Sequence, residues 1–404
     1  MDNKKLNDII TKIMVIFPVI TLLQGIPIFS YINKIMLGIL VLPIFFCYFT
    51  KKITLSKILT IVITLILYIF SIIFTNGPLE SINDLFYFGF WILFFVYLKD
   101  NINYLENSIK KNKTFILGTV IFWNLLVLLS VFCSGSFINK WDGIYFCSLA
   151  NDCHRFASSC IFIIVLNFIA LKETKKWYYF PLIFIPYISI FYTGARIYLL
   201  LLLALSLGII YCLSDSKKKF INYSIIFLIC SSCLVMFTPM RNKIMVPRSL
   251  NLKEVDFLHL SEQDQKMLID SVTNTRTTFM KEDINGYLKL NFLKKLVGNG
   301  YNYVYDLNEI ALDSRIWAHN DIINILLNYG LIGTLLYLFV LISFCISYYR
   351  HCKIPTFLLL LFIFIYFSNS MINMVYTYIN ATISLPFILY AFSLKNKVSN
   401  EITM

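Results

Sequence analysis

Long apolar blocks constrain this chain more than any other feature of its sequence. Twelve blocks of roughly 17–20 residues follow one another, separated by polar segments that carry lysine and arginine. A helix of that length crosses about 30 Å of hydrocarbon, so each block predicts a membrane span. The expected spans are 9–24, 34–50, 55–75, 82–98, 114–133, 156–171, 178–193, 196–213, 220–238, 322–348, 354–370 and 377–394. The pattern predicts an all-α polytopic integral membrane protein with about 12 transmembrane helices.

Composition places the chain outside the class of soluble proteins. Hydrophobic residues make up 58% of the sequence and charged residues 14%, whereas soluble domains carry roughly 25% charged residues. A cytosolic enzyme, a disordered chain and a secreted disulfide scaffold are therefore excluded. The ten cysteines are scattered along the chain. Cys147 and Cys153 share one polar loop, where a disulfide is an open alternative if that loop faces an oxidising compartment.

Lysine and arginine are distributed unevenly among the segments between the blocks. Alternate segments, which would share one side of the membrane, hold 20 basic residues. The short loops of the other side hold four, namely Lys34, Lys140, Arg155 and Arg196. Basic residues in short loops mark the cytoplasmic side. The asymmetry predicts that both termini are cytoplasmic, and it explains the net charge of +13 without a nucleic-acid partner.

One long segment, 239–318, interrupts this alternation. It holds 11 Lys/Arg and 10 Asp/Glu and no apolar block of membrane length. The alternation of the spans places it outside the cytoplasm, and it divides the chain into 1–238, 239–318 and 319–404. Two amphipathic stretches, Phe257–Ile269 and Ile284–Leu296, predict short helices that lie on the membrane surface. Because long structureless loops are uncommon, we expect this segment to form an ordered extracytoplasmic cap.

The arginines are concentrated on the predicted outer side, where six of the seven lie. A planar guanidinium binds phosphate with two parallel hydrogen bonds, whereas a lysine is sufficient as a membrane anchor. The bias therefore predicts an outer-face site for a phosphorylated anion. The alternative, favoured for Arg241, Arg248 and Arg315, is surface ion pairing in the large loop. No acidic residue lies in the interior of an expected span, and Asp84 and Asp321 lie at span ends. Because ion-coupled transporters usually carry acidic residues within the membrane, this absence disfavours such a transporter.

A set of short motifs surrounds the end of the large loop. Gly298–Gly300 forms a Gly-x-Gly element, Trp317–Asp321 contains a His-Asn pair, and Gly330–Gly333 forms a Gly-x-x-Gly turn that enters an apolar block. This order of elements resembles the O-antigen and capsular polysaccharide polymerase family (Wzy), within the superfamily of O-antigen polymerases and ligases. The resemblance covers most of the chain and implies a fold similar to the type C glycosyltransferases.

His319 is the central residue of this signature. It lies just before an apolar block, and Asn320 and Asp321 are favourable residues for a helix N-terminus. A helix N-terminus can bind pyrophosphate oxygens, and a neutral imidazole there can accept a hydroxyl proton. The alternative is a histidine at a membrane interface that bonds to backbone or lipid headgroups.

Three arginines are further candidates. Arg196 ends the tight turn Tyr192–Arg196, whose Gly194 and Ala195 would let a polar ligand approach the backbone; snorkelling to the interface is the alternative. Arg276 precedes the Gly-x-Gly element and matches the family's loop arginine loosely. Arg155 begins an expected span, and capping or surface roles are equally open for it and Arg276.

The resemblance implies an inverting, metal-independent glycosyltransferase without a cofactor. It would transfer a growing glycan from undecaprenyl pyrophosphate onto a single lipid-linked repeat unit, at the outer face of the bacterial cytoplasmic (inner) membrane. Expected partners are the lipid-linked donor and acceptor, the lipid bilayer, a chain-length-regulating copolymerase and a flippase. The expected catalytic residues are His319, Arg196 and Arg276, and the expected substrate-binding residues are Arg155, Asn320, Gly298, Gly300, Tyr301 and Arg315. An O-antigen ligase and a lipid-linked oligosaccharide flippase or transporter are the alternatives.

Overall fold

The computed structural model describes residues 3–29, 31–50, 54–75, 78–140, 143–244, 276–313 and 315–402. Nine helices in these ranges are long and apolar enough to cross a membrane. The predicted class, a helical polytopic membrane protein, is therefore confirmed. The count of about twelve spans and the orientation of the chain stay predictions.

The helices follow the apolar blocks closely. The elements are α1 (Asn3–Leu23), η1 (Pro27–Phe29), α2 (Ile32–Thr50), α3 (Leu55–Phe74), α4 (Pro78–Lys111), α5 (Lys113–Ser130), η2 (Ser134–Ser136), η3 (Ser148–Ala150), α6 (Cys153–Thr174), η4 (Trp177–Ile183), α7 (Phe184–Thr193), α8 (Arg196–Leu213), α9 (Lys217–Phe237), α10 (Met240–Ile244), α12 (Arg276–Lys289), α13 (Phe292–Val297), α14 (Tyr303–Leu312), α15 (Asp321–Cys352), α16 (Thr356–Asn373) and α17 (Ile379–Ile402).

Three expected spans have a different form in the structure. The span expected at 82–98 is part of the longer helix α4, which bends at Asn101. The span expected at 178–193 is divided into η4 and the short helix α7; Pro181 lies within η4 and lacks the N–H that a continuous α-helix needs. The span expected at 377–394 begins at Ile379, and its apolar part is shorter than those of the nine long helices.

Helix α6 is enclosed by its neighbours, because α1, α5, α7 and α17 all pack against it. Its residues from Phe156 to Leu171 are all buried, as expected of a helix that is apolar on every side. Helices α2, α3 and α9 lie at the periphery and expose large apolar side chains, among them Phe46 and Ile73. Such faces suit contact with lipid.

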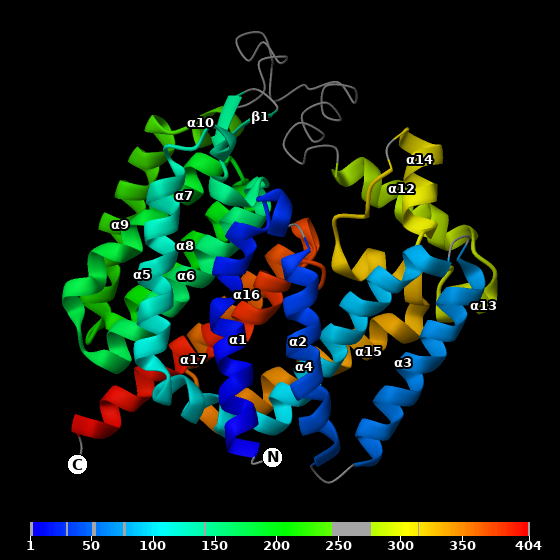
Figure 1. Ribbon diagram of the computed structural model, residues 1–404, viewed down its shortest axis with the longest axis horizontal. Helices are drawn as coiled ribbons and strands as arrows, with labels where there is room; N and C mark the ends of the chain where they lie inside the picture. The colour runs from blue at the N-terminus through cyan, green and yellow to red at the C-terminus, as the bar shows by residue number, and fades with distance from the viewer. Residues whose placement is uncertain are drawn as a thin grey trace.

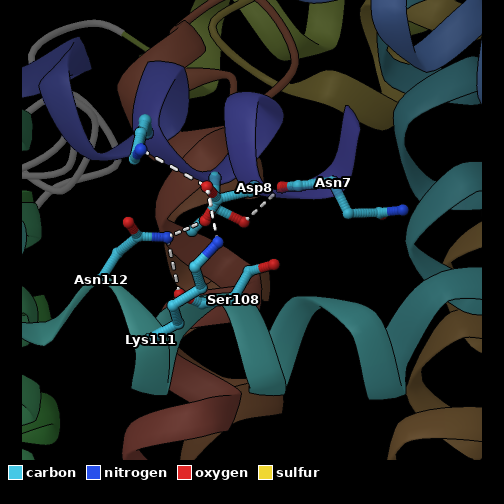
Figure 2. A network of polar contacts seen from close by, with 7 residues as sticks. Asn7, Asp8, Ser108, Lys111 and Asn112 are labelled. Carbon is cyan, nitrogen blue, oxygen red and sulfur yellow. Dashed lines mark hydrogen bonds and ion pairs between the residues drawn. The ribbon is translucent and has the colours of Figure 1, made fainter. Parts of the chain in front are cut away.

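Both ends of the chain lie at the same end of the bundle, at the bottom of Figure 1, and α10, α12 and α14 lie at the opposite end. Asp8 of α1 fixes this lower end by binding the junction of α4 and α5 (Figure 2). The Nζ atoms of Lys111 and Lys12 lie 3.2 and 3.3 Å from Asp8 Oδ2, and the Asn112 side chain donates to Asp8 Oδ1.

Two short strands form an antiparallel hairpin that the sequence analysis did not predict, beside the helices that define the class. Strand β1 (Phe137–Lys140) pairs with β2 (Gly143–Phe146), so that Phe137 lies opposite Phe146. Aromatic and β-branched residues in both segments favour strands, with Gly143 after the turn. Tyr145 of β2 packs with Cys147 and Cys153 in a small buried cluster. Both cysteines are thiols, and no disulfide joins them.

The helices described in 239–318 are α10 and α12–α14. The amphipathic stretch expected at Phe257–Ile269 lies outside the described residues. The stretch expected at Ile284–Leu296 is two helices and not one, because Asn291 caps α13 by accepting a hydrogen bond from the Lys294 backbone N–H at 2.9 Å. Leu288 and Phe292 are exposed beside this break, as a membrane-surface segment requires.

Candidate functional site

His319 lies in the loop that enters α15, with a positive φ of 53°. Left-handed backbone is uncommon for residues other than glycine, so the surrounding contacts must hold it. Asn320 confirms its expected role as N-cap, since its Oδ1 accepts from the Ile323 N–H at 3.1 Å. Its Nδ2 donates to the Met371 carbonyl at 3.4 Å, which ties the loop to α16. The Asn320 side chain therefore positions His319 through backbone contacts.

Asp321 connects the start of α15 to the segment between α16 and α17. Its fully buried carboxylate accepts from the Tyr337 hydroxyl at 2.8 Å and from the Val375 N–H at 3.0 Å. Asn324, one turn later, donates to the Tyr376 hydroxyl. These bonds fix residues 374–378 beside the His319 loop and place Tyr378 in the site.

Two arginines share this site with His319. Arg276 is the first described residue of α12, and its pKa is lowered by burial, an effect opposed by Tyr378 and enhanced by the positive charge of Arg196. Arg196 begins α8, and its Nη1 donates to the Lys243 carbonyl at 3.4 Å. Arg276 is thus close enough to interact electrostatically with both His319 and Arg196, which belong to two other segments.

His319 is neutral in this environment. Burial is the largest cause that lowers its pKa from 6.5 to about 4, and the positive charge of Arg276 and the neighbouring His154 act in the same direction. Above about pH 4 the imidazole therefore offers a lone pair, and the arginines supply the positive charge of the site. A neutral imidazole can accept a proton from a hydroxyl group.

Arg155 and Tyr378 line one cavity. Burial is the main cause that raises the pKa of Tyr378 to about 12, and the charges of Arg155 and Arg276 oppose this shift. Arg155 is exposed and lines a cavity of about 130 Å³. The other lining residues are Thr21, Gln24, Asn33, Lys34, Tyr87, Ser158, Thr377, Tyr378, Ile379 and Asn380. The lining contains two basic side chains, several amides and hydroxyls, and no acidic residue, so the cavity suits an anionic or hydroxyl-rich ligand.

Four residues of this region were missed by the sequence analysis. The His154 ring on α6 lies 6.1 Å from the Tyr198 ring on α8, between centroids, and the Asn373 Nδ2 donates to the Tyr198 hydroxyl at 2.8 Å. Tyr378 is the fourth. His154 could have been predicted as a candidate because it directly precedes Arg155 in the sequence. Tyr198, Asn373 and Tyr378 lie within or beside apolar blocks, where a single polar residue does not indicate a functional role.

The glycine motifs pack two backbones against each other. Gly298, Gly300 and Gly330 all have positive φ, and α15 breaks at Gly330. A Cβ on Gly298 would lie 2.1 Å from the Asn328 carbonyl oxygen, and one on Gly330 would lie 2.3 Å from the Leu296 carbonyl oxygen. The Asn299 N–H donates to the Leu327 carbonyl at 2.9 Å. The described contacts of Gly298 and Gly300, which we expected to bind substrate, are thus with α15 and α3.

We expect Gly330→Ala to destabilise the protein by roughly 2–4 kcal/mol, because the new methyl group meets fixed backbone atoms and the residue keeps a strained φ. The melting temperature of the purified protein in detergent measures this effect. Gly118→Ala is the matched control, since a Cβ there meets no atom within 4 Å. Equal melting temperatures for the two variants would contradict the packing role of Gly330.

Gly194 also has a packing role. Its φ is +65°, and a Cβ there would lie 2.3 Å from the ring of Tyr145. The aromatic ring of β2 therefore occupies the space that the sequence analysis assigned to a polar ligand. The interpretation of Gly194 as an opening for ligand is not supported by this contact.

The remaining arginine and tyrosine candidates lie in the cap. Arg315 is exposed, and its Nη1 lies 2.8 Å from Asp306 Oδ1 and 2.7 Å from Glu309 Oε2, which matches the alternative of a surface ion pair. The Tyr301 N–H donates to Thr75 Oγ1 at 3.1 Å, an anchor of the cap on the end of α3. Arg241 is exposed in α10, and Arg248 lies outside the described residues.

The fold and site define an α-helical membrane protein with a cluster of arginine, histidine and tyrosine side chains at the end of the bundle that faces away from its termini. Comparison of the chain with protein-family models and with curated proteins finds no match. Its function must therefore be argued from the site itself.

Proposed function

We propose that this protein polymerises undecaprenyl-pyrophosphate-linked oligosaccharide repeat units into surface polysaccharide, either O-antigen or capsule. The observation that carries the proposal is the electrostatic coupling of Arg276 to both His319 and Arg196, three residues from three separate segments. A pyrophosphate-linked sugar presents two features to a protein, an anionic leaving group and an electrophilic carbon. Two guanidinium groups near a neutral imidazole meet both requirements.

The reaction needs a leaving group and a proton acceptor. An acceptor sugar hydroxyl attacks the anomeric carbon of the growing glycan, the bond from that carbon to the phosphate oxygen breaks, and undecaprenyl pyrophosphate departs. Arg196 and Arg276 stabilise the charge that develops on the departing oxygen, a task that a divalent cation performs in many other transferases. His319 accepts the hydroxyl proton, and the single displacement inverts the configuration of the anomeric carbon.

The pKa of His319 links donor binding to catalysis. A base with a pKa of about 4 is weak at neutral pH, and Arg276 is one cause of that low value. A pyrophosphate bound between the two residues offsets the positive charge of Arg276. The pKa of His319 then rises toward its ordinary value, so that the imidazole becomes a stronger base when the donor is present.

This linkage predicts a difference between two pH profiles. A base that must be neutral loses activity as pH falls through its pKa. The pH dependence of kcat/KM reports the free enzyme, so its acid limb is expected near pH 4. The pH dependence of kcat reports the complex with bound donor, so its acid limb is expected at higher pH. Arg276→Gln removes a charge that lowers the His319 pKa, and it should move the kcat/KM limb to higher pH. Arg350→Gln, at the other end of α15, is the control and should leave the limb unchanged. An unchanged limb in Arg276→Gln would contradict the coupling.

The lipid-linked oligosaccharides of a deletion strain test the proposed function. If the deleted protein is a polymerase, the strain accumulates single repeat units on the lipid carrier at the outer face. Intact polymer that remains on the carrier would instead indicate a ligase, and repeat units trapped at the cytoplasmic face would indicate a flippase. Either of these results would overturn the proposal.

The proposal places the site at the outer face of the bacterial cytoplasmic membrane and both termini in the cytoplasm. Support comes from the basic residues of the short segments and from the common position of the two chain ends (Figure 1). A membrane-impermeant thiol reagent should label the exposed Cys133 in intact spheroplasts, and Cys133→Ser should lose that labelling. Labelling of Cys133 only after permeabilisation would reverse the orientation. A copolymerase and a flippase are the proposed partners.

A further inference from the structure

A second cluster of polar side chains lies at the other end of α15, roughly 45–50 Å along the helix from His319. Cys352 Sγ donates to Glu106 Oε1 at 3.0 Å, and His351 Nε2 lies 3.8 Å from Glu106 Oε2. One ligand atom from each of the three residues lies within 4.8 Å of the other two. Among the described residues, this is the one group of histidine, cysteine and acidic side chains with the spacing of metal ligands.

The three ligand types favour a particular ion. Thiolate, imidazole and carboxylate together suit zinc, which binds them at about 2.0–2.3 Å in a tetrahedral arrangement. Ligand atoms of such a site are roughly 3.3–3.8 Å apart, so small side-chain rotations bring the cluster to that geometry. Calcium and magnesium are disfavoured because they take oxygen ligands.

The fold provides two further features that stabilise a cation here. Helix α15 ends at Cys352, followed by Lys353 with φ +47°, so its C-terminal carbonyls place partial negative charge beside the cluster. The fully buried Tyr348 has Cys352 and Glu106 as electrostatic neighbours. A hydroxyl at that position can orient a ligand from behind, as residues around metal sites commonly do.

We propose that Glu106, His351 and Cys352 form a zinc-binding site with a fourth position for water. Binding converts the Cys352 thiol to a thiolate and releases its proton to solvent, while His351 binds as neutral imidazole and Glu106 as carboxylate. The ion joins the second half of α4, beyond its bend at Asn101, to the end of α15. The proposed role of the ion is to join these two helices, and it does not depend on the proposed polymerase activity.

Cobalt titration of the purified full-length protein in detergent tests the site, because cobalt replaces zinc and reports its ligands by absorption. Wild-type protein is expected to develop a thiolate-to-cobalt charge-transfer band that saturates at one ion per chain and disappears on addition of zinc. Cys352→Ser should abolish the band. Glu106→Gln and His351→Ala should keep it but weaken cobalt binding at least 10-fold.

Cys345→Ser is the matched control, because this cysteine lies on the same helix but outside the cluster. It should leave the band and the cobalt affinity unchanged. The proposal is overturned if wild-type protein gives no charge-transfer band, or if the band survives Cys352→Ser. If Cys352→Ser does not fold, the cobalt affinity of Glu106→Gln tests the proposal instead. A cobalt affinity of Glu106→Gln equal to that of wild type would overturn the proposed site.

Discussion

Replacing His319 with alanine is expected to lower the rate of polymerisation by roughly 10²–10⁴-fold, the range lost with one general base. The imidazole is held neutral beside Arg276, so it is the group in the described cluster best suited to accept the acceptor hydroxyl proton. Membrane insertion should persist, because α15 is apolar enough to insert without it. The measurement uses purified enzyme with a lipid-linked repeat unit, at matched protein amounts and melting temperatures.

Two further variants separate the possible roles of the imidazole. His319→Gln and His319→Asn keep a hydrogen-bonding side chain but cannot accept a proton at neutral pH. Rates as low as that of His319→Ala indicate a general base, whereas partial recovery indicates a hydrogen-bond role toward sugar or phosphate. Wild-type turnover in His319→Ala would contradict the proposed site and bring forward the flippase alternative.

Arg276→Lys is expected to reduce the rate by about 10²–10³-fold although it preserves the positive charge. A guanidinium offers two parallel N–H groups to a phosphate, and an ammonium offers a single point of contact. Arg276 is half-buried, and burial together with the charge of Arg196 lowers its pKa, so its side chain is not that of a fully solvated surface arginine. Arg196→Lys should show a loss of the same kind, since Arg196 shares the site.

Arg350→Lys is the matched control for this substitution. Arg350 is exposed near the opposite end of α15, and the lysine variant should retain wild-type turnover. Equal activity of Arg276→Lys and Arg350→Lys would show that the site requires charge alone, and it would remove the argument for bidentate phosphate binding.

Local properties of the sequence determined the class of this protein and the positions of its helices. Length and hydrophobicity of an apolar block are sufficient to predict a membrane helix, because each block must satisfy its own backbone hydrogen bonds in lipid. The N-cap at Asn320 was also predictable, since a side-chain oxygen there contacts the next turn. The candidates His319, Arg196 and Arg276 came from short motifs and from the side of the membrane on which arginine gathers.

Contacts between distant segments decided the rest. Asp321 binds Val375, Gly298 packs on the backbone of Asn328, and Glu106 contacts Cys352 across 246 positions of sequence. The sequence gives no period or spacing that links such residues, because their approach depends on how whole helices bend and pack. The sequence analysis favoured a surface ion pair for Arg315, but only the tertiary structure identified its partners Asp306 and Glu309 and placed Arg276 within electrostatic reach of His319.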